Sequence, residues 1–298
     1  MTLQQLIYAV KIADMKSMNR AATELFVSQP ALSATVRGLE EEIRTEIFLR
    51  TNRGITITPE GEEFLSYARQ MVEMQKLMED RYLGTDHSKK KFSVSMQHYS
   101  FAVEAFIDLA KEFGMEEYEF AVHETKTAEV IDNVRNYRSE LGILYLNPFN
   151  EKALKKSFAE NEVEYTLLFQ CGISVYMSNR HPLAKKERLD FQELEPYPCL
   201  SFEQGDKNSF YFAEEVLSMQ DYPRIIKADD RATMLNLMTG LDGYTLCSGI
   251  ICEKLNGNGY TAIPLNTQER MDIGYIRRKH MPLSKLGKKY LEILKKYG

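Results

Sequence analysis

Three polar side chains, Gln29, Ser33 and Arg37, recur at intervals of four residues and could read DNA. In a helix this spacing places them on one face, about one turn apart. Glutamine can pair with adenine, serine with several bases, and arginine with guanine or phosphate. The alternative is that the three residues form an ordinary solvated helix face. The surrounding sequence favours DNA reading.

The segment that carries these residues has clear helix signals. Ser28 is a suitable N-cap, and Pro30 is tolerated in a first helical turn, where its missing N–H is no loss. Apolar Leu32, Val36 and Leu39 then follow at spacings of four and three residues. We therefore expect this apolar face to pack on a core and the polar face to meet solvent or DNA.

The elements on both sides complete a DNA-binding domain. An apolar stripe between Leu3 and Val10 predicts an earlier helix, and residues 48–59 resemble two short strands around an Asn-Arg-Gly turn. The residues from Ala21 onward also predict a short helix and a tight connection ahead of the Ser28 helix, which makes three helices in all. Three helices followed by a hairpin form a winged helix-turn-helix. The sequence thus predicts such a domain over residues 1–58, with Arg53 at the tip of the wing.

The first sixty residues resemble LysR-type transcriptional regulators. The resemblance rests on Ala21-Ala22, Leu25, the run from Val27 to Ser33, Leu39-Glu40, Phe48, Arg50, Arg53-Gly54, Thr58-Pro59 and Gly61. It is dense over residues 2–61, whereas the rest of the chain agrees in length and element order. Two positions differ from the family's usual pattern. Ile43-Arg44 replaces Leu-Gly where the helix ends, and Ala34 replaces a residue that is often basic, which removes one expected DNA contact.

The resemblance implies a transcription regulator that binds double-stranded operator DNA and a small-molecule effector. It also implies a homodimer or homotetramer, with RNA polymerase as a further partner. The predicted DNA-binding residues are Ser28, Gln29, Pro30, Ser33, Thr35, Arg37 and Arg53. The alternative class is a solute-binding protein or periplasmic-type enzyme domain with an incidental helical head. The density of the motif and the missing signal peptide favour the regulator.

Composition and charge fit a protein of two or more domains. The chain has 298 residues, of which 44% are apolar and 27% charged, which is ordinary for a globular protein. The formal charge is −5, but residues 1–58 hold seven Lys or Arg against six Asp or Glu, so the acidity lies elsewhere. Because a net charge of +1 is modest for a DNA-binding domain, we expect the domains of two chains to bind together and the affinity for DNA to fall as salt rises.

Nothing in the sequence predicts a membrane protein. No apolar stretch approaches the length of a membrane span, and the amino terminus lacks the basic start and apolar core of a signal peptide. We therefore expect a cytoplasmic protein with no membrane partner.

Residues 59–88 predict a dimerisation helix followed by a hinge. Thr58 can cap the helix, with Pro59 at its first position. Apolar residues then alternate four and three residues apart, which is a heptad seam with Gln75 as a polar interruption. The predicted dimerisation residues are Phe64, Ala68, Met71, Met78 and Tyr82. The alternative is a helix packed on its own domain. A two-fold dimer would need an operator that is an imperfect inverted repeat.

From residue 92 onward, short apolar runs alternate with amphipathic segments, as in α/β folds. We predict strands near residues 92–97, 118–123, 141–146, 163–169, 173–178, 198–202, 224–227, 244–247, 260–264 and 270–277. We predict helices near residues 101–113, 127–137, 150–158, 208–219, 230–240, 249–256 and 284–297. The fold class is therefore α/β, with an all-α-type winged helix-turn-helix N-terminal domain.

The resemblance implies that residues 89–298 form a two-lobed, periplasmic-binding-protein-like effector domain. Lobe I would comprise about 89–168 and 266–298, and lobe II about 169–265. Ligands of such folds bind where strands end and helices begin, because helix amino termini offer free N–H groups. The predicted effector-binding residues are Tyr99, Ser100, Thr125, Thr127, Phe202 and Ser248. With Lys126 nearby, these junctions favour a small anion, most plausibly an organic acid. The alternative is that the hydroxyls only cap helices and the cleft is closed.

Other chemistries have weaker support. His98 and His123 fall near strand ends, but two isolated histidines more often hydrogen-bond in a pocket than hold a metal, so we predict no metal. Four scattered cysteines form no CxxC pair, and we expect buried thiols over a redox pair. The sequence contains no phosphate-binding or nucleophile motif, so we predict no cofactor and no enzymatic activity.

Overall fold

The structure is a computed structural model that describes residues 1–51, 54–82, 90–113, 117–205 and 210–298. The chain forms two compact units, Met1–Ser88 and Lys89–Gly298, which we call the first and the second unit. Within the described ranges, no helix is both long enough and apolar enough to cross a membrane.

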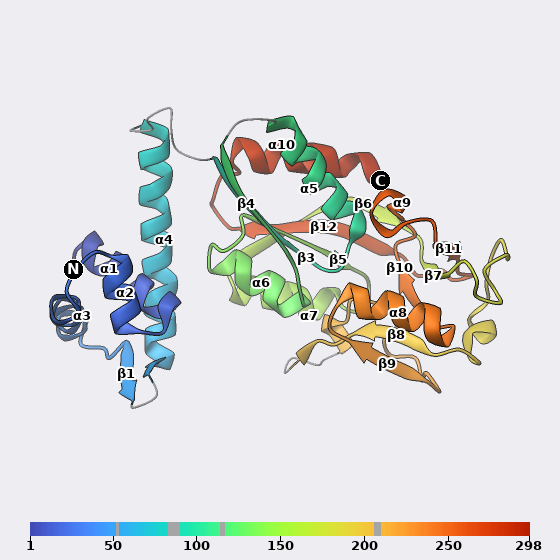
Figure 1. The fold of residues 1–298 in the computed structure, drawn as a ribbon, viewed down its shortest axis with the longest axis horizontal. Helices are drawn as coiled ribbons and strands as arrows, with labels where there is room; N and C mark the ends of the chain where they lie inside the picture. The colour runs from blue at the N-terminus through green and yellow to red at the C-terminus, as the bar shows by residue number, and fades with distance from the viewer. Residues whose placement is uncertain (52–53, 83–89, 114–116, 206–209) are drawn as a thin grey trace. The chain divides into compact units, whose positions relative to one another are not determined.

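The first unit is a winged helix-turn-helix followed by a long helix (Figure 1). Its elements are α1 (Leu3–Met15), α2 (Met18–Glu24), α3 (Gln29–Ile43), β1 (Phe48–Thr51), β2 (Gly54–Ile57) and α4 (Pro59–Tyr82). Leu32, Val36 and Leu39 of α3 are almost fully buried in the core of this unit, so the predicted apolar face is confirmed.

Local hydrogen bonds explain where these helices begin and end. The Ser28 hydroxyl accepts a hydrogen bond from the Ala31 N–H at 3.4 Å, and Thr58 accepts one from the Gly61 N–H at 2.8 Å. Both predicted caps are thereby confirmed. Arg44, the residue that follows the last residue of α3, has a left-handed backbone with a φ of 54°. A left-handed residue at a helix end is usually glycine, because a side chain is strained in this conformation. This chain adopts the same helix end with arginine.

Helix α4 buries one face of its first half and exposes an apolar stripe on another face, which begins at Tyr67. Phe64 and Ala68 lie on the side that packs against the first unit, and Ala68 is only 2% exposed. The exposed apolar residues alternate four, three and four positions apart: Tyr67, Met71, Met74 and Met78, each 45–57% exposed. The predicted seam is thus wrong in its first half, because the helix uses Phe64 and Ala68 to pack on its own unit. The side chain of Tyr82 lies outside the described residues.

The second unit contains two five-stranded mixed sheets with helices packed on them (Figure 1). In the first sheet the strand order is β4-β3-β5-β12-β6, and in the second it is β11-β7-β10-β8-β9. The strands are β3 (Lys90–Met96), β4 (Tyr118–Glu124), β5 (Leu141–Leu146), β6 (Val163–Cys171), β7 (Ser174–Ser178), β8 (Cys199–Phe202), β9 (Ile225–Ala228), β10 (Tyr244–Cys247), β11 (Tyr260–Pro264) and β12 (Met271–Arg278). The α-helices are α5 (Ser100–Phe113), α6 (Thr127–Arg135), α7 (Glu151–Glu160), α8 (Arg231–Leu241), α9 (Glu253–Asn256) and α10 (Lys285–Leu294).

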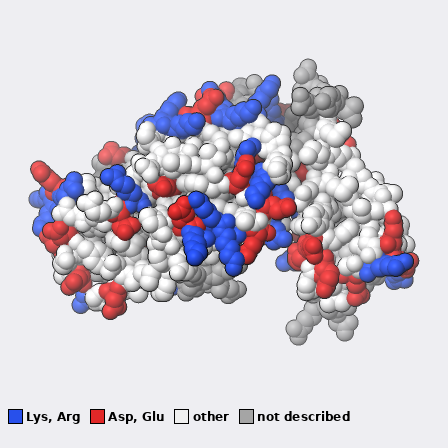
Figure 2. Space-filling model, turned by 180° about the vertical axis from the view of Figure 1, so that it is seen from behind, with Lys and Arg blue, Asp and Glu red and all other residues white. Residues whose placement is uncertain are grey.

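We call the first sheet with its helices lobe I and the second lobe II. Strand β6 pairs with β12 as far as Cys171, and β7 belongs to the other sheet from Ser174. The chain therefore crosses between the lobes at residues 172–173 and returns at 265–270, between β11 and β12. The ten strands lie close to the predicted ones, and the α/β fold class is confirmed. On the face shown in Figure 2, basic side chains lie among acidic ones, so the described residues form no broad patch of one sign there.

One predicted helix is wrong. The sequence predicts a helix over residues 208–219, but the described part contains only the short 3₁₀ helix Phe210–Phe212 followed by turns. The reason is tertiary, because Glu214 and Glu215 in this segment are both 6% exposed and hydrogen-bond to groups of the surrounding sheets. These contacts override the local helical pattern.

Candidate functional site

The DNA-reading residues predicted on α3 differ in exposure. Pro30 and Arg37 are exposed, and Gln29 is half-buried at the first position of the helix. Ser33 is only 9% exposed, because the arc of α3 that packs on the unit also includes this residue. The expectation that Ser33 lies on the solvent face is therefore wrong. Exposed Ala34 lies at the centre of the open arc instead.

The other predicted DNA-binding residues have local structural partners or lie outside the description. Ser28 caps α3, and the half-buried Thr35 donates its hydroxyl hydrogen to the Ala31 carbonyl at 2.9 Å. Arg53 lies outside the described residues. Among the predicted DNA-binding residues that the structure describes, only Ser33 is buried. The exposed Ser28, Pro30 and Arg37 and the half-buried Gln29 and Thr35 can all be reached by solvent, or by DNA.

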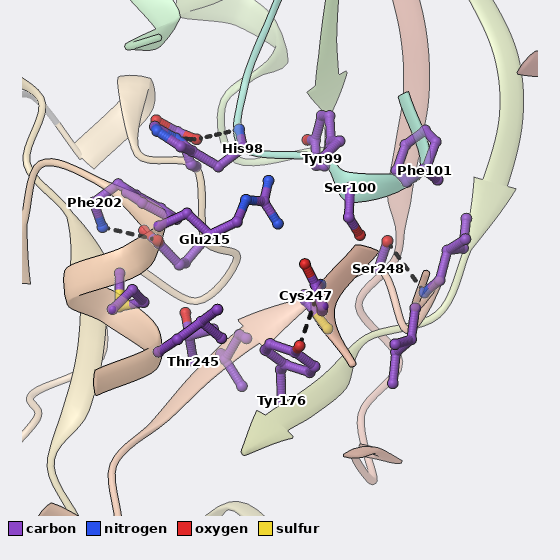
Figure 3. Close-up of a pocket in the computed structure, with 18 of the residues that line it drawn as sticks. His98, Tyr99, Ser100, Phe101, Tyr176, Phe202, Glu215, Thr245, Cys247 and Ser248 are labelled. Atoms are coloured by element: carbon purple, nitrogen blue, oxygen red, sulfur yellow. Dashed lines mark hydrogen bonds and ion pairs between the residues drawn. The ribbon is translucent and has the colours of Figure 1, made fainter. Parts of the chain in front are cut away.

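In the second unit, a cavity of about 80 Å³ lies between residues of lobe I and lobe II (Figure 3). This volume admits a small molecule or a few waters. Lobe I contributes the junction between β3 and α5, including Tyr99 and Ser100, while most of the remaining lining comes from lobe II. Met234 and Met238 of α8 line it with Ile251, so much of the wall is apolar.

A buried carboxylate connects the two lobes beside this cavity. Glu214 of lobe II accepts a hydrogen bond from the His98 backbone N–H at 2.9 Å, and its Oε2 lies 2.8 Å from His98 Nδ1. Its other oxygen accepts from the Gln204 side-chain amide at 3.0 Å. The His98 ring also stacks on Phe202, with 3.7 Å between ring centroids and 4° between planes. These contacts fix one wall of the cavity.

The amino terminus of α6 is already occupied by the chain itself. The Thr127 backbone N–H donates to the Gln204 side-chain oxygen at 3.1 Å. The Thr127 hydroxyl accepts a hydrogen bond from the Gln97 side-chain amide at 2.6 Å, and Thr127 is completely buried. The half-buried Thr125 hydroxyl donates to Glu129. Thr125 and Thr127 therefore lie outside the cavity lining, contrary to the sequence-based grouping.

Two cations near the cavity also have acidic partners from the opposite lobe. Lys126 Nζ lies 3.5 Å from the Asp229 carboxylate, and Arg231 forms an ion pair with Glu124. The predicted anion site depended on Lys126 and the start of α6, and both now have internal partners. The physical basis for an anionic ligand is therefore weaker than the sequence indicated.

Two polar groups in the cavity have capacity for a ligand. The Thr245 hydroxyl is buried, lines the cavity and has no hydrogen-bond partner, which is costly unless a ligand or water supplies one (Figure 3). Nearby, Glu215 accepts a hydrogen bond from the Phe202 N–H at 2.9 Å. Burial raises the pKa of Glu215 to about 8, and the negative Glu214 beside it adds to the rise.

The cysteines have the properties of structural thiols. All four are free, and burial raises the pKa of each thiol, to about 11 for Cys247, which lines the cavity. The pKa rises to about 12 for the others, Cys171, Cys199 and Cys252. Raised values keep these groups as thiols at neutral pH, which disfavours nucleophilic or redox reactivity.

Four of the six predicted effector residues line the cavity: Tyr99, Ser100, Phe202 and Ser248. Sequence reasoning missed Glu214 and Glu215, because they fall in a segment predicted to be a helix, residues 208–219. It also missed Thr245, for which a signal existed. Thr245 is a polar residue between apolar neighbours in a strand that ends just before Ser248.

Two family models match most of the chain. The family model described as "Bacterial regulatory helix-turn-helix protein, lysR family" matches residues 3–62, and "LysR substrate binding domain" matches residues 115–298. YbhD of Escherichia coli (strain K12), an uncharacterised HTH-type transcriptional regulator, is 25% identical over 295 residues, covering 96% of this chain and 88% of that protein. CysB of Haemophilus influenzae, an HTH-type transcriptional regulator, is 26% identical over 211 residues, covering 69% of this chain and 62% of CysB.

Solved structures show the same fold at low identity. A full-length OxyR variant from Pseudomonas aeruginosa superposes with a TM-score of 0.68 at 21% identity, covering 100% of this chain and 94% of that one. Full-length CbnR in complex with its target DNA gives a TM-score of 0.60 at 16% identity, with both chains fully covered. At these identities the likeness concerns the fold alone.

The state of Glu215 can be tested through the pH dependence of stability. Its pKa in the folded chain, about 8, is above the ordinary value of 4.5, so the group favours folding while it is protonated. The free energy of unfolding should therefore fall as pH rises from about 4.5 to 8. Glu215→Gln should remove this contribution, so the difference between variant and wild type should grow by about 1.4 kcal/mol per pH unit. Urea unfolding of both proteins at several pH values measures it; parallel pH profiles would contradict the shift.

Proposed function

Because this chain belongs to the LysR family, and is therefore a DNA-binding transcription regulator with an effector-binding C-terminal domain, we propose that the cavity between lobes I and II is its effector site. The buried Thr245 hydroxyl carries this proposal, since it is unpaired and lines the cavity. The match of residues 3–62 to a DNA-reading family does not favour the alternative of a solute-binding protein. A regulator of this kind acts on chromosomal DNA, so the proposal places it in the cytoplasm.

In the first unit, the proposal assigns base reading to the amino-terminal end of α3. Gln29 begins this helix and is reachable by solvent, and amino-terminal residues of a recognition helix contact base edges. Exposed Arg37 lies two turns farther along, where contact with a phosphate positions the helix without reading sequence.

In the second unit, the charges around the cavity favour a ligand that is neutral or cationic and donates hydrogen bonds. The carboxylate of Glu214 lines the cavity, and so does Glu215, whose carboxyl is mostly protonated at neutral pH because its pKa is about 8; the lining Arg231 is neutralised by Glu124. The Thr245 hydroxyl and the Glu215 carboxyl can both accept from a ligand N–H, and Met234 can contact its apolar part. This replaces the sequence-based expectation of an organic acid.

We further propose that two chains associate through the exposed stripe of α4. The stripe of Tyr67, Met71, Met74 and Met78 keeps heptad spacing and leaves four large apolar side chains about half exposed. A second copy of the helix would cover it and would place two reading heads on an inverted repeat.

Replacing Gln29 tests the reading assignment. Gln29→Ala should cost about 1–3 kcal/mol of affinity for an operator selected in vitro from random duplexes, and should relax preference at one base pair. Arg37→Ala is the matched comparison, since loss of a phosphate contact should weaken binding to all sequences and reduce the salt slope. Fluorescence anisotropy over a salt series measures both. Unchanged specificity in the Gln29 variant would contradict the assignment.

Charges placed in the α4 stripe test the dimer. The double variant Met71→Glu, Met78→Glu should be monomeric in sedimentation, because two chains would bury four uncompensated charges. Lys76→Glu, an exposed position outside the stripe, is the control and should keep the wild-type mass. A double variant with unchanged mass would exclude this surface as the interface.

Three compounds with one carbon skeleton test the ligand class: isobutylamine, isobutyramide and isobutyrate. The amine or the amide should raise the midpoint of thermal unfolding more than the acid does, because the cavity offers acceptors and buried carboxyls. Thr245→Val should reduce the effect, whereas Thr239→Val, on the exposed part of α8, should not. Stabilisation by isobutyrate alone would contradict the charge argument, and an effect that survives Thr245→Val would place the ligand elsewhere.

A further inference from the structure

The turn between α2 and α3 holds an apolar residue in an unfavourable backbone conformation. Helix α2 ends at Glu24, and Phe26 follows with a φ of 54°. The Val27 N–H donates to the Ala22 carbonyl at 3.0 Å, and the Phe26 N–H donates to Thr23 at 3.2 Å. This hydrogen-bond pattern is a left-handed helix end in which glycine is the usual residue, because a side chain there is strained.

The fold makes no use of the Phe26 side chain. It is 96% exposed, more than any other large apolar residue that the structure describes. Its neighbours Leu25 and Val27, by contrast, pack against the core of the first unit. Phe26 therefore combines a strained backbone with an apolar surface in water, and burial within its own unit compensates for neither. An uncompensated outlier of this kind is a reason to look for a function.

The position of Phe26 identifies the surface that could cover it. Phe26 lies two residues before the cap Ser28 and three before Gln29, in the turn that leads into the recognition helix. In a helix-turn-helix, the amino-terminal end of the recognition helix enters the major groove, and the preceding helix crosses the backbone. The turn between them therefore lies at the edge of the same groove. Among groove surfaces, the thymine methyl group is the apolar contact for phenylalanine.

We propose that Phe26 is a DNA-contacting residue whose ring packs on a thymine methyl group at the edge of the major groove that α3 enters. This inference rests on the proposed reading role of α3 and adds an apolar contact to its polar ones. The exposed ring is buried on binding, and the free energy of this burial offsets the backbone strain at Phe26. The contact also makes the residue selective for A·T pairs, because cytosine lacks the methyl group.

The proposal predicts opposite effects on stability and on DNA affinity. In the full-length protein, Phe26→Gly and Phe26→Asn should raise the midpoint of thermal unfolding, because both residues tolerate a left-handed φ. The same variants should bind the selected operator about tenfold more weakly, the scale of one lost base contact. Arg44→Gly is the stability reference, since it relieves the same strain at the end of α3. Phe26→Leu should keep most of the affinity and gain no stability.

Replacing thymine by deoxyuridine in the operator tests the contact itself, because it removes only the methyl group. Wild type should lose affinity at one or more such positions, and Phe26→Asn should lose nothing further there. A variant that binds as tightly as wild type overturns the proposal. Weaker binding without a deoxyuridine effect assigns the ring to deoxyribose and overturns the thymine contact. If Phe26→Asn has a lower mass than wild type in sedimentation, the ring contacts a second copy of the chain, and the DNA contact is overturned.

The Gln29→Ala variant, measured on the same operator, separates this proposal from the reading role of α3. If Gln29→Ala loses affinity and Phe26→Asn does not, only the Phe26 contact is wrong. If neither variant loses affinity, the docking of α3 is wrong and the Phe26 proposal fails with it.

Discussion

A buried hydrogen-bond network joins the two lobes of the second unit, and in it Glu214 bonds to Gln204, which in turn accepts from the start of α6. Among the described residues the two sheets of this unit are separate, so no strand ladder between them connects lobe I to lobe II. Glu214, whose side chain is 4% exposed, instead bonds to His98 in one lobe and to Gln204 in the other. A buried carboxylate is tolerable because its oxygens are hydrogen-bonded, and losing one partner would leave a charge or an N–H unsatisfied. The stacked rings of His98 and Phe202 then set the wall of the cavity.

The same contacts explain why a shared fold does not fix the ligand. In a two-lobed domain the start of α6 is suited to an anion, but here Gln204 takes the Thr127 N–H and Asp229 lies beside Lys126. Gln204 and Asp229 thus occupy the hydrogen-bonding and ion-pairing positions that an anionic ligand would otherwise take. What remains open to a ligand is the Thr245 hydroxyl and the carboxyl of Glu215. Function therefore follows from these residues and not from the fold alone.

Much of this could be predicted from the sequence, because local patterns carry local structure. The caps at Ser28 and Thr58 follow from side-chain chemistry, and the ten strands of the second unit follow from short apolar runs between amphipathic segments. What failed depends on long-range packing. Ser33 is buried because α3 packs over a wide arc, and residues 208–219 are not helical because Glu214 and Glu215 bond to distant groups. The cavity lining was predicted only in part for the same reason. Strand ends can be recognised in a sequence, whereas the packing of Glu214 and Glu215 from a turn distant in sequence cannot.

The cavity has lining residues from both lobes, which restricts how a ligand can act. Tyr99 and Ser100 come from lobe I, and Thr245 and Ser248 come from lobe II. A ligand that touches both lobes can change their arrangement only by the difference in its affinity for two arrangements. Such coupling is typically 1–3 kcal/mol, which is similar to the net contribution of one or two hydrogen bonds. Several side-chain contacts, including the ion pair of Arg231 with Glu124, already connect the lobes without a ligand. A ligand contact that replaces one of these contacts would therefore change the free energy of the lobe arrangement by an amount sufficient for regulation.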